Sequence, residues 1–220
     1  MSGILSFWAE HGRNLDLTES IFVVQSASLT GVACNDTPTA YSATEAMLCL
    51  YNSALATASP GENQRLIPIC LRLQATTVNT SGTSFSIQQY LDTGDRYTSG
   101  GTAFTPVTTA RDTRTGYTSR TPKGTFHFGN LTVVTTTSTA QKVGDTILSD
   151  VIAAADDVYE LWWDLGGKGF KHTSYYQRSC APVVVGRNCS LTLHDISPSA
   201  SADFDPQFEF VYLELGHPRF

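Results

Sequence analysis

Large apolar residues alternate with polar residues along several short segments of this chain, with a period of two. Successive side chains of a β-strand point to opposite faces, so this period predicts strands with one buried face. The pattern is clearest in 158–165 (VYELWWDL) and in 207–215 (QFEFVYLEL), where the phase shifts at Leu213 and Leu215. The residues predicted to share a face are Tyr159, Leu161, Trp163 and Leu165 in the first segment, and Phe208, Phe210 and Tyr212 in the second.

Short apolar runs separated by turn-forming residues predict further strands. In 65–73 (RLIPICLRL), Pro68 cannot donate to a sheet ladder and predicts an edge position or a bulge. Gly129 predicts a bulge in 125–134. The further strand segments are 20–25, 46–51, 65–73, 84–91, 125–134, 182–186 and 189–195. The residues of these segments predicted to share a face are Ile67, Ile69, Leu71 and Leu73 in one, Phe126 and Phe128 in another, and Leu191 and Leu193 in a third.

One segment, 144–157 (GDTILSDVIAAADD), predicts a short helix with Asp145 as its N-cap. Together the segments predict an all-β fold of about eight or nine strands, arranged as a sandwich or barrel, with one short helix. All-β proteins of 220 residues are often one domain. We therefore expect a single β-sandwich domain over 15–220, preceded by an N-terminal arm over 1–14.

The amino-acid composition limits the kinds of partner that we expect. Charged residues make up only 15% of the chain, and the formal net charge is −6. An acidic surface repels nucleic acid and anionic membranes, so we expect neither as a partner. No run approaches the roughly 18 apolar residues of a membrane span, and the first residues lack the pattern of a signal peptide.

The five cysteines form no metal-binding motif. Cys49 and Cys70 lie within apolar runs and are expected to be buried. A Cys180–Cys189 disulfide fits an oxidising compartment, but without an export signal we predict free thiols. The histidines are scattered without ligand spacing, so we assign no metal and no other cofactor.

The triplet Asp92-Thr93-Gly94 matches the one that carries the catalytic carboxylate in aspartic proteases. A second segment, 182–188 (PVVVGRN), resembles the apolar-apolar-Gly-Arg-Asn segment of retroviral-type proteases. This resemblance implies a homodimer in which Asp92 is the catalytic carboxylate, Thr93 braces the dimer and Gly94 permits close approach. A dimer is needed because such catalysis uses two carboxylates that share a proton.

The residues around the triplet favour a turn instead. The family places an acid at the position of Arg96, which would here face Arg187 with like charge. Asp-Thr-Gly is a favourable turn sequence, because Asp closes an Asx-turn and Gly accepts a positive φ. We predict a strand that ends at this triplet, with Ser99–Gly101 letting the chain reverse, and we assign no catalytic residue. His194 and Asp195 are expected to have ordinary surface or capping roles.

Two segments stand out as partner-contact candidates. The polar loop 108–124 (TTARDTRTGYTSRTPKG) has one acidic residue and four basic ones. Loops of this length are uncommon unless they are functional or disordered. The N-terminal arm carries aromatic residues that fit either core filling or an anchor on a neighbouring subunit. The candidate residues are Arg111, Arg114, Arg120 and Lys123 in the loop, and Phe7 and Trp8 in the arm.

A longer resemblance runs from Ala46 to Leu215. The ordered segments MLCLYNSA, IPICLRLQAT, SFSIQQYLDTGDRYTSGGTAFTP, VIAAADDVYELWWDLGG and APVVVGRNCSLTLHD resemble those of structural proteins of tailed bacteriophages. The resemblance implies a non-enzymatic virion protein with a jelly-roll-like β-sandwich, most plausibly a capsid-decorating (cement) protein. Such a protein binds the major capsid protein on the capsid surface as a homotrimer and assembles in the host cytoplasm.

Two alternatives stay open at this stage. One is a tail or fibre component with a glycan- or receptor-binding β-sandwich, in which Trp162 or Trp163 stacks on sugars. Because alternation places these two residues on opposite faces of their strand, at most one of them is available. The other alternative is a homodimeric aspartic protease that uses Asp92.

Overall fold

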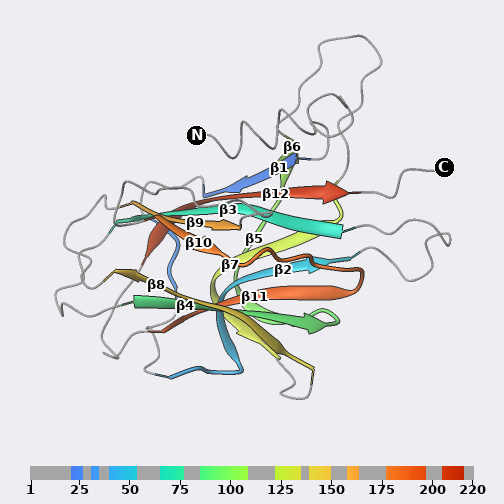
Figure 1. Cartoon of the computed structure of the whole chain (residues 1–220), viewed down its shortest axis with the longest axis horizontal. Coiled ribbons are helices and arrows are strands. Elements are labelled where there is room, and N and C mark those ends of the chain that lie inside the picture. The colour runs from blue at the N-terminus through green and yellow to red at the C-terminus, as the bar shows by residue number, and fades with distance from the viewer. Residues whose placement is uncertain are drawn as a thin grey trace, which may run out of the picture.

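The computed structural model describes residues 21–26, 31–34, 40–53, 65–76, 85–108, 122–134, 139–149, 158–163, 177–196 and 205–215 (Figure 1). Within these residues the chain forms twelve β-strands and no helix. No helix there could therefore cross a membrane. The strands are β1 (Ile21–Gln25), β2 (Glu45–Asn52), β3 (Arg65–Ala75), β4 (Phe85–Thr93), β5 (Tyr97–Phe104), β6 (Val107–Thr108), β7 (Gly124–Val133), β8 (Gln141–Ser149), β9 (Val158–Trp163), β10 (Gln177–Cys180), β11 (Cys189–Ile196) and β12 (Pro206–Leu215).

The strands form two six-stranded sheets that lie face to face (Figure 1). Sheet A has the order β10-β9-β3-β12-β1-β6, and sheet B has the order β5-β7-β2-β11-β4-β8. All neighbouring strands are antiparallel except β9 and β10, which are parallel. The predicted all-β sandwich is confirmed.

Eight of the strands have the connectivity of a jelly roll. When β1, β2, β3, β4, β8, β9, β11 and β12 are numbered one to eight, sheet A contains the order 1-8-3-6 and sheet B the order 2-7-4-5. This is the arrangement of two interleaved Greek keys. The remaining strands extend the sheet edges, and three of them (β5, β6 and β7) come from one insertion between β4 and β8. The predicted strands include β7 but omit β5, β6, β8 and β10. The predicted strand 182–186 is wrong, since this segment forms only an isolated bridge between Val185 and Leu66.

The inner faces of the two sheets bury one large apolar core. Its centre is aromatic: Phe208 of β12 stacks on Phe128 of β7, with ring centroids 4.1 Å apart. The alternation in β9 is confirmed, since Tyr159, Leu161 and Trp163 are at most 4% exposed. Leu165 lies outside the described residues.

The predicted helix is wrong over the part that the structure describes. Residues 144–149 belong to β8, which pairs with β4 so that Gly144 lies opposite Gln89 and Thr146 opposite Ile87. A short apolar run fits either a helix or a strand, and here an available sheet edge decides between them. Asp145 is therefore a strand residue and not an N-cap, while 150–157 lie outside the described residues.

A bulge in β3 changes the predicted face of its apolar residues. Val211 pairs with Cys70 and Tyr212 with Pro68, so Ile69 has no opposite residue. The extra residue moves the following side chains to the other face. Leu71 and Leu73 therefore enter the core, while Ile67 and Ile69 lie on the outer face. They do not share one face as predicted. The bulge alternative for Pro68 is correct, and the edge alternative is wrong because β3 lies between β9 and β12.

The bulge predicted at Gly129 is present in β7, where the pairing with β2 shifts between Leu131 and Phe128. Gly129 has a φ of 110°, and a Cβ there would lie 2.8 Å from the carbonyl oxygen of Ala33.

We expect Gly129→Ala to lower the free energy of unfolding by about 3 kcal/mol, because it adds a backbone clash to the conformational strain. Urea denaturation measures the change.

Gly94 supplies the matched control for this prediction. It also has a positive φ, of 84°, but a Cβ there would meet nothing within 4 Å. Gly94→Ala should therefore cost only about 1 kcal/mol, the strain of the left-handed conformation alone. Equal losses for the two variants would contradict the role assigned to the close contact at Gly129.

Candidate functional site

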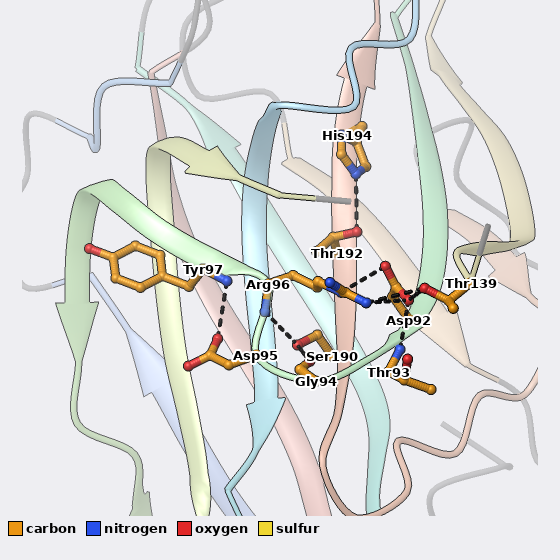
Figure 2. Close-up of polar contacts among 10 residues, drawn as sticks. All are labelled: Asp92, Thr93, Gly94, Asp95, Arg96, Tyr97, Thr139, Ser190, Thr192 and His194. Atoms are coloured by element: carbon orange, nitrogen blue, oxygen red, sulfur yellow. Dashed lines mark hydrogen bonds and ion pairs between the residues drawn. The ribbon is translucent and has the colours of Figure 1, made fainter. Parts of the chain in front are cut away.

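The Asp92-Thr93-Gly94 triplet lies where β4 ends on the outer face of sheet B (Figure 2). Gly94 takes its positive φ in the turn, and its N–H donates to the carbonyl of Asn188, 2.6 Å away. Ser190 of the neighbouring β11 clamps the same turn, since its hydroxyl donates to the Gly94 carbonyl (2.7 Å) and accepts from the N–H of Arg96 (3.2 Å). The predicted strand end and turn are therefore present.

A turn over 94–96 follows β4, and β5 begins at Tyr97, before the predicted Ser99–Gly101 segment. Because each neighbouring pair from β4 through β11, β2 and β7 to β5 is antiparallel, β5 runs in the same sense as β4, and the turn is not a hairpin. Tyr97 N–H donates to the carboxylate of Asp95 (3.0 Å), which closes an Asx-turn after the triplet. Ser99, Gly100 and Gly101 instead belong to β5 and pair with β7. Gly100 and Gly101 have a positive φ (82° and 57°) where the β5–β7 register shifts, so they form a bulge within β5. A Cβ at Gly100 would also clash with the carbonyl oxygen of Asn130 in β7.

The Asp92 carboxylate pairs with Arg96, and one of its oxygens, Oδ1, accepts three hydrogen bonds. The Nε of Arg96 lies 2.8 Å from its Oδ2, and the Nη2 of Arg96 donates to its Oδ1 (3.0 Å). The N–H of Thr93 (2.7 Å) and the hydroxyl of Thr139 also donate to Oδ1. The Asp92 side chain is 0% exposed and that of Arg96 is 15% exposed. This Asp92–Arg96 lock joins β4, the following turn and the start of β8 (Figure 2).

The lock does not have the geometry that peptide hydrolysis requires. The two protease-like segments do meet, because Cys189 pairs with Thr93 directly after PVVVGRN. Asp92, however, is paired with a guanidinium and closed to solvent, whereas a catalytic carboxylate must face its twin and an attacking water. The expected opposition of Arg96 and Arg187 is replaced by the Arg96–Asp92 pair. The arrangement therefore supports a structural role for the triplet.

His194 and Asp195 are buried, and the prediction of ordinary surface roles is wrong. They are 1% and 3% exposed, on opposite faces of β11. The Tyr41 ring contacts the His194 ring edge-on at 4.9 Å on the outer face of sheet B, and the Nε2 of His194 lies 3.0 Å from the Thr192 hydroxyl. Burial lowers the pKa of His194 from 6.5 to about 4.

Asp195 points into the sandwich beside Leu193, on the face opposite to His194. Burial, with a smaller contribution from the Glu45 carboxylate, raises the pKa of Asp195 from 3.8 to about 7, although a backbone hydrogen bond opposes the change. The Oδ2 of Asp195 has no hydrogen-bond partner among the described residues. Because burying the charged form is costly, the folded protein is most stable when this carboxyl group is neutral.

The structure describes the two ends of the basic loop, Thr108 in β6 and residues 122–124. Lys123 is exposed, and its backbone N–H donates to the Oε1 of Glu214 (2.7 Å). The same oxygen accepts from the N–H of Gly124 (2.9 Å), and Glu214 is 0% exposed. Glu214 continues the inward alternation of β12 beside Tyr212, so the predicted phase shift at Leu213 is wrong. Arg111, Arg114 and Arg120 lie outside the described residues.

The aromatic candidates divide between described and undescribed residues. Phe7 and Trp8 lie outside the described residues. Trp163 is buried and donates to the side-chain oxygen of Gln89 (2.9 Å), so it is closed to any ligand. Trp162 lies half-buried on the outer face of sheet A and donates to Glu160 (3.1 Å). The prediction that at most one of these tryptophans is available is consistent with this placement.

The cysteines agree with their predicted state. All five are free thiols, and Cys49 and Cys70 are buried. In the described part of the chain, no cluster of His, Cys, Asp and Glu side chains is suited to a metal ion. In comparisons with known proteins, no protein family, curated protein or solved structure matches this chain.

The Asp92–Arg96 lock predicts strong energetic coupling between its two residues. Asp92→Asn should cost about 3 kcal/mol, because it leaves a largely buried guanidinium without its counter-charge. The double variant Asp92→Asn/Arg96→Gln should cost at least about 1 kcal/mol less than the sum of the two single variants. Urea denaturation of the four proteins at pH 7 measures this coupling.

The pair Lys142–Asp145 is the matched control for that cycle. Its two charges are also close (2.7 Å), but its side chains are 41% and 46% exposed. Exposed pairs contribute little, so the cycle Lys142→Gln/Asp145→Asn should give a coupling below about 0.5 kcal/mol. Similar couplings in the two cycles would show that Asp92–Arg96 is an ordinary surface pair.

The buried Asp195 predicts a stability that falls with rising pH. Its folded-state pKa is about 7 against an ordinary value of 3.8, so its cost is absent below about pH 4 and complete above pH 7. Asp195→Asn should therefore stabilise the protein by about 2–4 kcal/mol at pH 8 and hardly at all at pH 4. Urea denaturation across this range measures the difference.

His194 has the opposite sign and serves as the control. Its folded-state pKa is about 4, so the wild-type protein loses stability as the pH falls from 6.5 toward 4. The difference in the free energy of unfolding between the wild type and His194→Gln should therefore become smaller as the pH falls from 6.5 toward 4. A gain from Asp195→Asn that is the same at pH 4 and pH 8 would contradict the ionisation account.

Proposed function

We propose that this chain is a capsid decoration (cement) protein of the tailed-bacteriophage type, which binds the outside of the shell at local symmetry positions. It performs no chemistry and stabilises contacts between capsid subunits. The ordered resemblance over Ala46–Leu215 supports this proposal, and so does the jelly-roll connectivity, which is common among viral coat proteins. The one motif that suggested catalysis, at Asp92, is used as a structural lock.

The observation that carries the proposal is the anchoring of the basic loop. A buried carboxylate, Glu214, fixes the backbone of Lys123 and Gly124 at the end of the sandwich. The Lys123 carbonyl in turn accepts from both the N–H and the hydroxyl of Ser53 (3.2 and 2.6 Å). A loop of four basic residues on a rigid base, in a chain of net charge −6, is suited to meeting an acidic surface.

A symmetric oligomer would increase the affinity of the protein for the shell. A homotrimer matches a local three-fold position on a shell, because closed symmetric oligomers present the same surface on each subunit. Three linked contacts of modest strength then give high avidity. The five free thiols fit assembly in a reducing host cytoplasm.

Neutralising the loop tests this proposal. The variant Arg111→Gln/Arg114→Gln/Arg120→Gln/Lys123→Gln lowers the formal net charge by four, from −6 to −10. We expect occupancy on purified shells to fall at least tenfold at 50 mM salt and to lose most of its salt dependence, because the charge contacts are gone. Quantitative mass spectrometry of sedimented shells measures occupancy.

A control variant with the same net charge places the four changes on Arg65, Arg72, Lys142 and Arg187, which lie outside the loop. It should keep most of its occupancy. Unchanged occupancy of the loop variant would contradict the proposed contact between the loop and the shell.

The copy number of the protein in purified virions, relative to the major capsid protein, distinguishes a cement protein from the tail-component alternative, because a tail component is present in only a few copies.

A further inference from the structure

The outer face of sheet A is divided into an apolar half and a polar half. Aligned positions on neighbouring strands form rows across the sheet. The first row is Ile21–Leu213–Ile67, the second is Val107–Val23–Val211–Cys70–Trp162, and the third is Gln25–Glu209–Arg72–Glu160. The outer face of an antiparallel sheet is usually polar. The first two rows, which we call the apolar seat, therefore need a cover.

Exposure across the seat is graded. In the first row, Ile21, Ile67 and Leu213 are at most 7% exposed, although they lie on the outer face. In the second row, Cys70 is 8% exposed and Val107 is 57% exposed. Apolar residues of an outer face that are this little exposed are covered by other parts of the chain, so the seat is a contact surface. The sheet end with the lowest exposure is the end at which β1 begins, at Ile21.

Several undescribed segments join the sheet at this end, and their sequences distinguish them. The segments 54–64, 109–121 and 216–220 each carry a single large apolar residue, which is Leu55, Tyr117 and Phe220 respectively. The segment 164–176 has to connect β9 with the parallel strand β10, a crossover that itself takes about a dozen residues.

Residues 1–20 differ in composition from the first three of these segments, whereas 164–176 has a similar share of large apolar residues (Leu165, Phe170, Tyr175 and Tyr176) but forms the crossover. The segment 1–20 joins the first row directly at Ile21, the first residue of β1. Its large apolar residues are Met1, Ile4, Leu5, Phe7, Trp8, Leu15 and Leu17. It is therefore the segment whose composition matches the seat.

We propose that the apolar seat on sheet A binds the chain's own N-terminal segment, residues 1–20, with Phe7 and Trp8 as its anchors. Trp8 precedes Ile21 by 13 residues, which span up to about 45 Å when extended. The five strands of the second row cover only about 20 Å. The segment therefore reaches every residue of the seat, and its attachment at Ile21 gives it a high effective concentration there.

Cys70, in the second row, is a built-in probe of this contact. Burial raises the pKa of its thiol, and alkylation requires the thiolate, so a covered Cys70 reacts slowly. In the full-length variant Phe7→Asp/Trp8→Asp we expect the rate of N-ethylmaleimide alkylation at Cys70 to rise at least tenfold. Peptide mass spectrometry measures the rate at each cysteine separately.

Other positions supply the controls. The variant His11→Asp/Asn14→Asp adds the same two negative charges to polar positions of the segment, and should leave Cys70 as slow as in the wild type. Cys49, 0% exposed on the other sheet, reports any loss of the fold, and the half-buried Cys189 calibrates the reagent. Unchanged Cys70 reactivity in Phe7→Asp/Trp8→Asp, with Cys49 still protected, would overturn the proposal.

Hydrogen exchange of the unmodified protein tests the contact without any substitution. Amides within 1–20 should exchange at least tenfold more slowly than in an unstructured peptide, and exchange at the free rate would contradict the proposal. The protection should also be the same at 1 and 100 μM protein. Protection that appears only at the higher concentration would assign the seat to the segment of a second copy and exclude docking within one chain.

Discussion

The aromatic contact between β12 and β7 joins the two sheets, and the insertion depends on it. Phe208 stacks on Phe128 and Phe126, and Phe210 lies 5.1 Å from Phe126. Because β12 is central in sheet A while β7 belongs to the insertion, the inserted hairpin is part of the core and not an appendage. Glu214, on the same strand as the two phenylalanines, binds the first residues of that hairpin. The core thus sets the position of the basic loop.

Alternation predicted most of the strands because one face of each is apolar, as in β9, where three inward residues were identified correctly. It failed where the period itself changes. The bulge at Ile69 inserts one residue, and no local pattern shows that Ile67 and Leu71 then face opposite ways. The segment at 144–149 failed for another reason: its backbone is paired by β4, a partner about 60 residues away. Local sequence contains no information on such an edge.

The candidate site shows the same limit at the level of side chains. Turn chemistry identified the end of β4, because Asp and Gly have strong local preferences. The partner of Asp92 was missed, although Arg96 is only four residues away, because the tight turn that brings them together also needs Ser190 of β11 and Asn188 just before that strand. His194 was expected to have a surface or capping role because it lies at the end of a predicted strand, whereas both faces of β11 are covered.

The outer faces of the two sheets differ in their side chains. The outer face of sheet B stabilises the fold, whereas the outer face of sheet A is the proposed binding surface. Sheet B carries on its outer face the buried Asp92–Arg96 pair, with Thr139 donating to Asp92, and a small apolar cluster of Ala46, Cys49, Leu131 and Val133 against which Tyr97 packs. Sheet A presents apolar rows that no polar network can satisfy. The hydrophobic effect is not directional, so such a face accepts any matching apolar segment. Docking therefore belongs to sheet A, while the charged contacts proposed for assembly belong to the loop that Glu214 anchors.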